Sequence, residues 1–139
     1  MSDAASVARE FLDAWNRRDW ETFRRVLDDQ YTYTGGDGQT QQGPEAGVAV
    51  GRMFATAFPD GRIEFQHIHS AGDTAVVEFI GRGTHNGDLM GIAPTGRQMS
   101  INVCTVLTVR NGKIATEREY MDMLHMMQQL GLVPAAATA

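Results

Sequence analysis

The sequence has few residues that could cross-link the fold covalently or bind a metal, with one cysteine, Cys104, in 139 residues. A lone cysteine excludes a disulfide within the chain and any metal cluster built on several thiolates. It is typical of a small residue in a core or a sheet. Proline is also scarce, at four residues. Because the composition is well mixed, it argues against disorder.

Long hydrophobic runs are missing as well. No apolar stretch approaches the roughly 20 residues that a membrane-spanning helix needs. The N-terminal residues MSDAASVAREF lack the basic region followed by an apolar run that marks a secretory signal. These absences predict a soluble, cytoplasmic protein with no membrane partner.

The chain also has no excess of positive charge. Its formal net charge is −5 and its pI is near 5.2. Some basic residues occur in pairs, Arg17–Arg18 and Arg24–Arg25, each close to acids. This pattern indicates solvated helix faces and excludes the electrostatic signature of nucleic-acid binding.

The chain does have enough apolar material for a core, with 42% hydrophobic residues in 139. This predicts one compact domain over residues 1–139. Apolar residues at helical spacing predict three helices in the N-terminal part, within residues 3–16, 19–27 and 44–58. Alternating residues predict strands at 31–34, 62–70, 74–85, 99–109 and 113–121. A short helix should follow at about 122–130.

This order of elements predicts an α+β fold. We expect a curved antiparallel sheet that forms a half-open cone, with the three N-terminal helices on its concave face. The cone would enclose an apolar pocket beneath the helices. Eight methionines, six of them in the second half of the chain, favour a plastic cavity that suits a polycyclic ligand.

The last strand carries the first candidate for chemistry. Strict alternation puts the charged Lys113, Glu117 and Glu119 on one face, which predicts that this face meets water. The opposite face holds Ile114, Thr116, Arg118, Tyr120 and Asp122. A carboxylate aimed at the interior is costly unless it is paired or used, so Asp122 is the leading candidate.

Asp122 has a second interpretation. It precedes the C-terminal helix, where its side chain could accept a hydrogen bond from the backbone amide of Leu124 or His125. Catalysis and helix capping are both compatible with its position.

Several motifs in residues 83–131 resemble the SnoaL-like polyketide cyclase family: GTHNGDLMGIAPTGR, NGKI, EREYMD and QQLG. That family lies in the nuclear transport factor two-like superfamily, which includes ketosteroid isomerase and scytalone dehydratase. The N-terminal FLDAWNRRDWETFRRVLDDQY resembles the helical pair of the same superfamily. The resemblance implies a cofactor-independent enzyme that closes a polyketide ring by intramolecular aldol condensation.

The resemblance also implies site residues. In the best-known members an aspartate late in the last strand is the acid/base, and Asp122 matches it. A histidine on the preceding strand assists there, and its position falls on Thr105. Because a threonine does not titrate near neutral pH, this departure leaves other reactions open, including hydroxylation, isomerisation, dehydration and epoxide opening.

Arg118 is the second catalytic candidate because it shares a face with Asp122 and can stabilise an enolate oxygen. An ion pair with Glu78 is its alternative. The candidates for substrate binding are Tyr33, His85, Thr105, Tyr120 and Trp15. His85 is expected at the pocket mouth, where it could replace the missing histidine. Tyr120 and Trp15 could equally be packing residues.

Histidines raise the question of a metal. His67 and His69 alternate on one strand, and with His85 they could form a three-histidine zinc site. No acidic second shell is evident in the sequence, and the resemblance implies no metal. We therefore predict neither a metal nor another cofactor.

The leading hypothesis is an acid/base enzyme of aromatic polyketide biosynthesis that acts on an apolar, polycyclic substrate. The first alternative is a related tailoring reaction in the same pocket. The second is a non-catalytic module that binds an apolar small molecule. The less apolar side of the strand at 99–109 carries Cys104 and Val106, which predicts that a second copy covers it in a homodimer or higher homo-oligomer.

Overall fold

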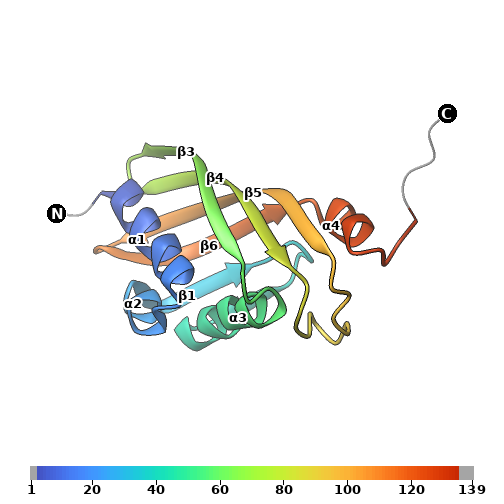
Figure 1. Ribbon diagram of the computed structural model, residues 1–139. Helices are drawn as coiled ribbons and strands as arrows, with labels where there is room; N and C mark the ends of the chain where they lie inside the picture. Colours follow the sequence, from blue (N-terminus) through green and yellow to red (C-terminus); the bar gives the residue numbers. More distant parts are fainter. Residues whose placement is uncertain (1–2, 135–139) are drawn as a thin grey trace.

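The computed structural model describes residues 3–134 and has a mixed α+β architecture (Figure 1). The helices are α1 (Ala4–Arg17), α2 (Trp20–Arg25), α3 (Pro44–Ala57) and α4 (Met123–Gln129). The strands are β1 (Leu27–Thr34), β2 (Thr40–Gln42), β3 (Arg62–Ala71), β4 (Thr74–Thr84), β5 (Gln98–Arg110) and β6 (Lys113–Met121). None of the helices in this part of the chain is long and apolar enough to cross a membrane.

The predicted helices are confirmed, and local chemistry sets where they begin. The Asp3 carboxylate accepts from the amide of Ser6 at 2.7 Å and caps α1. Asp19 caps α2 in the same way through the amide of Thr22 at 3.1 Å. Pro44 occupies the start of α3, where its missing N–H costs no helical hydrogen bond.

The six strands form one open sheet in the order β2-β1-β6-β5-β4-β3. Neighbouring strands are antiparallel except β1 and β6, which are parallel. The prediction of a purely antiparallel sheet is therefore wrong at this junction. Tight turns impose antiparallel pairing of β3 with β4 and of β5 with β6, whereas most of the chain separates β1 from β6 and leaves their direction free.

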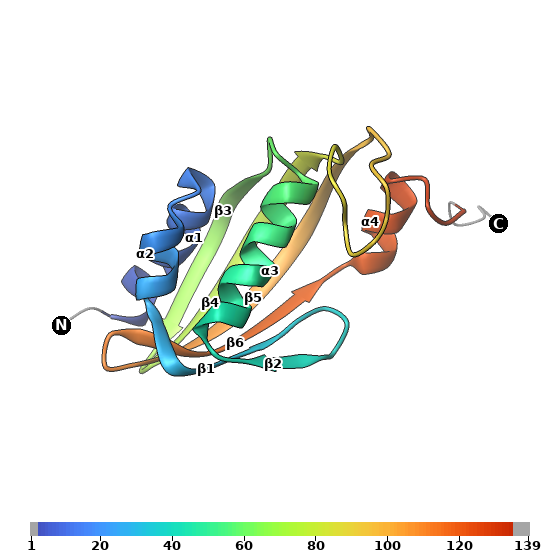
Figure 2. The ribbon, with the colours of Figure 1, turned by 90° about the horizontal axis from the view of Figure 1, so that it is seen from below.

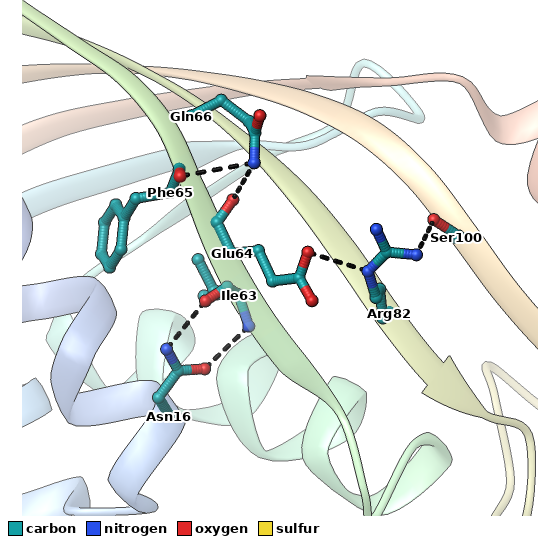
Figure 3. A network of polar contacts seen from close by, with 7 residues as sticks. All are labelled: Asn16, Ile63, Glu64, Phe65, Gln66, Arg82 and Ser100. Carbon is teal, nitrogen blue, oxygen red and sulfur yellow. Dashed lines mark hydrogen bonds and ion pairs between the residues drawn. The ribbon is translucent and has the colours of Figure 1, made fainter.

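Helices α1, α2 and α3 cover one face of the curved sheet (Figures 1 and 2). Their apolar residues pack with the inward side chains of the strands, including the fully buried Phe11, Tyr31, Phe58 and Leu107. The Asn16 side chain, next to the end of α1, also bonds both backbone groups of Ile63, at 2.7 and 3.0 Å, as Figure 3 shows. This contact positions β3 beside α1.

Two β-bulges interrupt the alternation of the strands. In β6, Ile114 pairs with Val109 and Thr116 pairs with Thr108, so that Ala115 is an extra residue without a partner. In β3, the register shifts between Phe65 and His67. A bulge adds one residue to one strand, so the side chains beyond it exchange faces.

The bulge at Ala115 reverses the predicted faces of β6. Glu117 is buried, with 5% of its surface exposed, and Glu119 lies on the same inward face. Arg118 is exposed and Tyr120 is 58% exposed. The prediction that Glu117 and Glu119 meet water while Arg118 and Tyr120 point inward is wrong for this reason.

Candidate active site

A cavity of about 100 Å³ lies between the helices and the inner face of the sheet. Helices α1 and α3 supply apolar walls, among them Phe11, Leu12, Trp15, Val50 and Phe54. The sheet supplies Phe79, Ile101, Val103 and Met121, and α4 supplies Met126. Such walls suit a flat, apolar ligand.

Two carboxyl groups interrupt this apolar lining. Glu117 and Glu119 are two residues apart on β6 and both border the cavity. Glu117 is buried, whereas Glu119 keeps part of its surface exposed. The pair therefore offers an inner carboxyl and one that is more accessible from the cavity.

Hydroxyl groups from the neighbouring strands hold both carboxyls. The Tyr31 hydroxyl on β1 donates to Oε1 of Glu117 at 2.6 Å, and the Thr105 hydroxyl on β5 lies 3.2 Å from Oε2. The Tyr33 hydroxyl donates to Oε1 of Glu119 at 2.9 Å. This network follows from the sheet order, because β6 lies between β1 and β5.

Burial sets the protonation of this network. Removal from water, together with the charge of Glu119, raises the pKa of Glu117 to about 8. Burial also raises the pKa of Glu119, against the opposing effect of the hydrogen bond from Tyr33. The pKa values of Tyr31 and Tyr33 rise by burial and by the nearby carboxylates, so both phenols stay neutral.

The arrangement can move a proton without a metal ligand or a histidine. A carboxylate in an apolar pocket, with its pKa raised toward neutrality, is a stronger base than one in water. The hydroxyls of Tyr31, Tyr33 and Thr105 fix where the carboxyl oxygens lie. General acid/base chemistry on an apolar substrate is the reaction type that this geometry supports.

The structure places two of the predicted substrate-binding residues on the cavity. Trp15 and Tyr33 both line it. The Trp15 indole N–H donates to the Gly51 carbonyl at 2.9 Å. This hydrogen bond holds the edge of the indole ring against α3. Thr105 is fully buried and reaches the site through Glu117.

Asp122, Arg118 and Tyr120 do not face this cavity. Asp122 and Tyr120 border a groove on the opposite face of the sheet, and Arg118 is exposed. The Asp122 side chain accepts from the amide of His125 at 2.9 Å and caps α4, as its second interpretation predicts. The inward orientation that made Asp122 and Arg118 catalytic candidates is contradicted, because the bulge at Ala115 precedes them.

His85 is not at a pocket mouth. It is fully buried, and its Nδ1 accepts from the amide of Thr95 at 3.2 Å and lies 3.0 Å from the Thr95 hydroxyl. Its backbone also bonds Arg97 and Gly96, both at 2.8 Å. His85 thus anchors the turn Pro94-Thr95-Gly96-Arg97.

The three histidines considered for zinc do not meet. His67 and His69 stack on the exposed face of β3, 5.9 Å apart, and His69 lies 3.6 Å from Glu78. Within residues 3–134, no group of three histidine, cysteine or acidic side chains could hold a metal ion.

Sequence reasoning missed Glu117, Glu119 and Tyr31. Strict alternation from Lys113 onward allows for no bulge and therefore places both glutamates on the water-facing side. One signal could have found them: Tyr-Thr-Tyr at 31–33 and Glu-Arg-Glu at 117–119 both repeat a polar group at the spacing of one strand face.

Comparison with known proteins connects this chain to a family. A family model described as SnoaL-like polyketide cyclase matches residues 5–130. Aklanonic acid methyl ester cyclase AcmA from Streptomyces galilaeus is 26% identical over 133 residues, which cover 94% of this chain and 92% of that protein. Nogalonic acid methyl ester cyclase from Streptomyces nogalater is 31% identical over 90 residues, which cover 64% of this chain and 67% of that protein.

A solved structure shares the fold. Wild-type IdmH from Streptomyces antibioticus superposes with a TM-score of 0.82 at 26% identity. The match covers 94% of this chain and 99% of that chain. The half-open, helix-covered sheet predicted from the sequence is therefore confirmed by the structure and by this neighbour.

Proposed function

Since the chain belongs to the SnoaL-like polyketide cyclase family, we propose that it closes a ring of an aromatic polyketide by an intramolecular aldol reaction. Two relatives are cyclases of aklanonic acid methyl ester and nogalonic acid methyl ester. A polycyclic polyketide ester is therefore the proposed substrate class. The apolar walls of the cavity support a ligand of this kind.

One observation carries the proposal: Glu119 presents a carboxylate on a mostly apolar wall, with Tyr33 donating to it at 2.9 Å. Its raised pKa makes it a better proton acceptor than an exposed glutamate. A C–H group between two carbonyls is acidic enough for such a base.

The proposed reaction is balanced in atoms and electrons. Glu119 takes the proton from the activated carbon, and the resulting enolate carbon attacks a ketone carbon of the same molecule. A carbon–carbon bond forms, the carbonyl π bond opens, and the oxygen takes a proton from the Glu119 carboxylic acid. Mass is conserved and nothing is oxidised, so the proposal needs no cofactor.

Turnover of the methyl esters of aklanonic and nogalonic acid tests the proposal. We expect a product of unchanged mass from the wild type. In Glu119→Gln, we expect the rate to fall by about 10²–10⁴-fold, since that is the usual contribution of one general base.

Asp122→Asn is the matched control because asparagine caps helices as well as aspartate does. It removes a carboxylate from the opposite face of the sheet and should leave turnover within a few-fold of wild type. A folded Glu119→Gln protein with wild-type turnover would overturn the role of Glu119. A product that gains oxygen or loses water would instead identify hydroxylation or dehydration in the same cavity.

A further inference from the structure

We propose that Glu117 is a protonated carboxylic acid at neutral pH, held between Tyr31 and Thr105 as a positioning residue. The negative charge of the carboxyl pair then lies on Glu119. This inference builds on the proposed role of Glu119, and it assigns Glu117 a task that the ring closure itself does not require.

The first step is the pattern of hydrogen bonds around Thr105. Its hydroxyl oxygen lies 3.2 Å from Oε2 of Glu117 and 3.4 Å from the backbone carbonyl of Arg118. A hydroxyl has one hydrogen to donate and lone pairs with which to accept. If the Thr105 hydroxyl donates to the Arg118 carbonyl, its lone pair can accept the proton of Glu117.

A neutral Glu117 is fully satisfied in this arrangement. Its Oε1 accepts from the Tyr31 hydroxyl at 2.6 Å, and its protonated Oε2 would donate to the Thr105 oxygen 3.2 Å away once the Thr105 hydrogen turns to the Arg118 carbonyl. Tyr31 and Thr105 are both completely buried. The proton of Glu117 is therefore held away from water at both ends.

The second step is the charge that surrounds the pair. The titratable groups that face Glu117 are Tyr31 and Tyr33 on β1 and Glu119 on β6, and none of them is a cation. The helices over the cavity contribute apolar side chains or glycine. Among residues 3–134, no ion pair joins Glu117 or Glu119 to a basic group.

Two arginines border the same cavity but belong to the opposite face. Arg62 and Arg82 are cross-strand neighbours, and Arg82 pairs there with Glu64 at 2.8 Å and bonds Ser100 at 3.0 Å (Figure 3). Within residues 3–134, neither arginine forms an ion pair with Glu117 or Glu119. Two carboxylates two residues apart in an apolar site cannot both be ionised at low cost.

The choice between the two carboxyls follows from exposure. Glu119 keeps surface in the cavity, where water or substrate can solvate its charge, whereas Glu117 is 5% exposed. The raised pKa of Glu117 points the same way. When Glu117 is neutral, no second negative charge lies beside the Glu119 carboxylate. The hydrogen bond from Tyr33 then orients the Glu119 carboxylate.

The direct test is infrared spectroscopy of the full chain without substrate. We expect the carbonyl band of a buried carboxylic acid at pH 7 in the wild type, and we expect it to be lost in Glu117→Gln. It should persist in Glu119→Gln, the matched variant two residues along the strand. In Thr105→Val, the band should shift because the acid loses its acceptor.

Absence of that band at pH 7, or its survival in Glu117→Gln, would overturn the proposal. Because this measurement needs no turnover, it stays decisive even if the methyl esters prove not to be substrates. Conversely, the band could be absent while Glu119→Gln still loses turnover. That result would overturn the proposal for Glu117 and leave the proposed function in place.

The pH profile supplies a second readout that a merely structural role would not move. Glutamine mimics a neutral Glu117, since its amide N–H can donate to Thr105 as the carboxylic acid does. We expect Glu117→Gln to differ from the wild type in the alkaline limb of the pH profile of kcat/KM, whatever its rate at pH 7. The loss of activity expected of the wild type as the pH rises through about 8, where Glu117 ionises, should be absent from the variant. A folded variant with unchanged pH dependence would contradict the inference.

Discussion

Glu119 is a carboxyl group in a partly buried, mostly apolar environment that raises its pKa. Its carboxylate lies on an apolar wall, and the Tyr33 hydroxyl at 2.9 Å is the donor that offsets part of the cost of its charge. Burial and this hydrogen bond act on the pKa in opposite directions. The balance between them decides at which pH Glu119 becomes a base.

Tyr33→Phe should therefore move the acidic limb of the pH–rate profile. The variant removes a hydrogen bond to the charged form, so the pKa of Glu119 rises further and activity begins at higher pH. A hydrogen bond to a charged group is worth ~1.5–3 kcal/mol, which corresponds to a loss on the order of tenfold or more at acid pH. Measurement of kcat/KM against pH checks this.

Tyr120→Phe is the control for the loss of a phenol. Its hydroxyl lies on the opposite face of the sheet, where the side chain is 58% exposed. The acidic limb of the pH–rate profile of Tyr120→Phe should coincide with that of the wild type. A limb that stays in place in Tyr33→Phe would show that the bond between Tyr33 and Glu119 does not set the pKa.

At the scale of the element, helices and strands followed from local chemistry, but strand faces did not. Asp3, Asp19 and Pro44 mark helix starts that any sequence reader can find. The bulge at Ala115 carries no such mark, because Ala115 is buried and its neighbours are ordinary strand residues. One unpaired residue was enough to transfer Asp122 and Arg118 out of the predicted site and Glu117 and Glu119 into it.

The same limit explains the other residues. Trp15 and Tyr33 were predicted to bind substrate and do line the cavity, because neither position depends on the register of β6. The parallel pairing of β1 with β6 was not predictable from turns. It brings the hydroxyls of Tyr31 and Tyr33 to the two glutamates, so the site depends on contacts between residues that are 86 positions apart.

The connector between β4 and β5 gives a prediction about stability. The amides of Asn86 and Gly87 both bond the Ala57 carbonyl at 3.1 Å, at the end of α3. A Cβ on Gly87 would lie 1.9 Å from the Thr56 carbonyl oxygen, and a backbone atom cannot move aside cheaply. Gly87→Ala should lower the free energy of unfolding by about 1–3 kcal/mol, measured by urea denaturation.

Gly81→Ala is the matched control. A Cβ there meets side-chain atoms no closer than 3.9 Å, which is an ordinary contact. Its stability should change by less than that of Gly87→Ala. Equal stability of the two variants would mean that the connector yields easily and does not fix the end of α3.

For the whole molecule, the two faces of the sheet have separate tasks. The inner face, under α1 to α3, holds the cavity and the carboxyl pair. On the outer face, Glu78, Cys104 and Tyr120 are cross-strand neighbours, and Val76, Val106 and Arg118 form the adjacent row. Mutations on one face can therefore be used to test it without disturbing the other.

The homodimer expected from the sequence stays a prediction, and the outer face is where it can be tested. Tyr120 is 58% exposed on this face, a large side chain of the type enriched at interfaces. We expect light scattering to give twice the chain mass of 15.3 kDa for the wild type. Tyr120→Asp should shift the mass to that of one chain, because an unpaired charge would be buried in the interface.

Met90→Asp controls for the change of an exposed apolar residue to a charge. Met90 is 48% exposed in the connector, away from the outer face of β4 to β6, so this variant should keep the wild-type mass. Because Tyr120 does not border the cavity, a monomeric Tyr120→Asp protein should also keep the infrared band of Glu117. A dimer that persists in Tyr120→Asp would place the contact between copies elsewhere. Loss of the band together with the dimer would show that the carboxyl pair depends on assembly across the sheet.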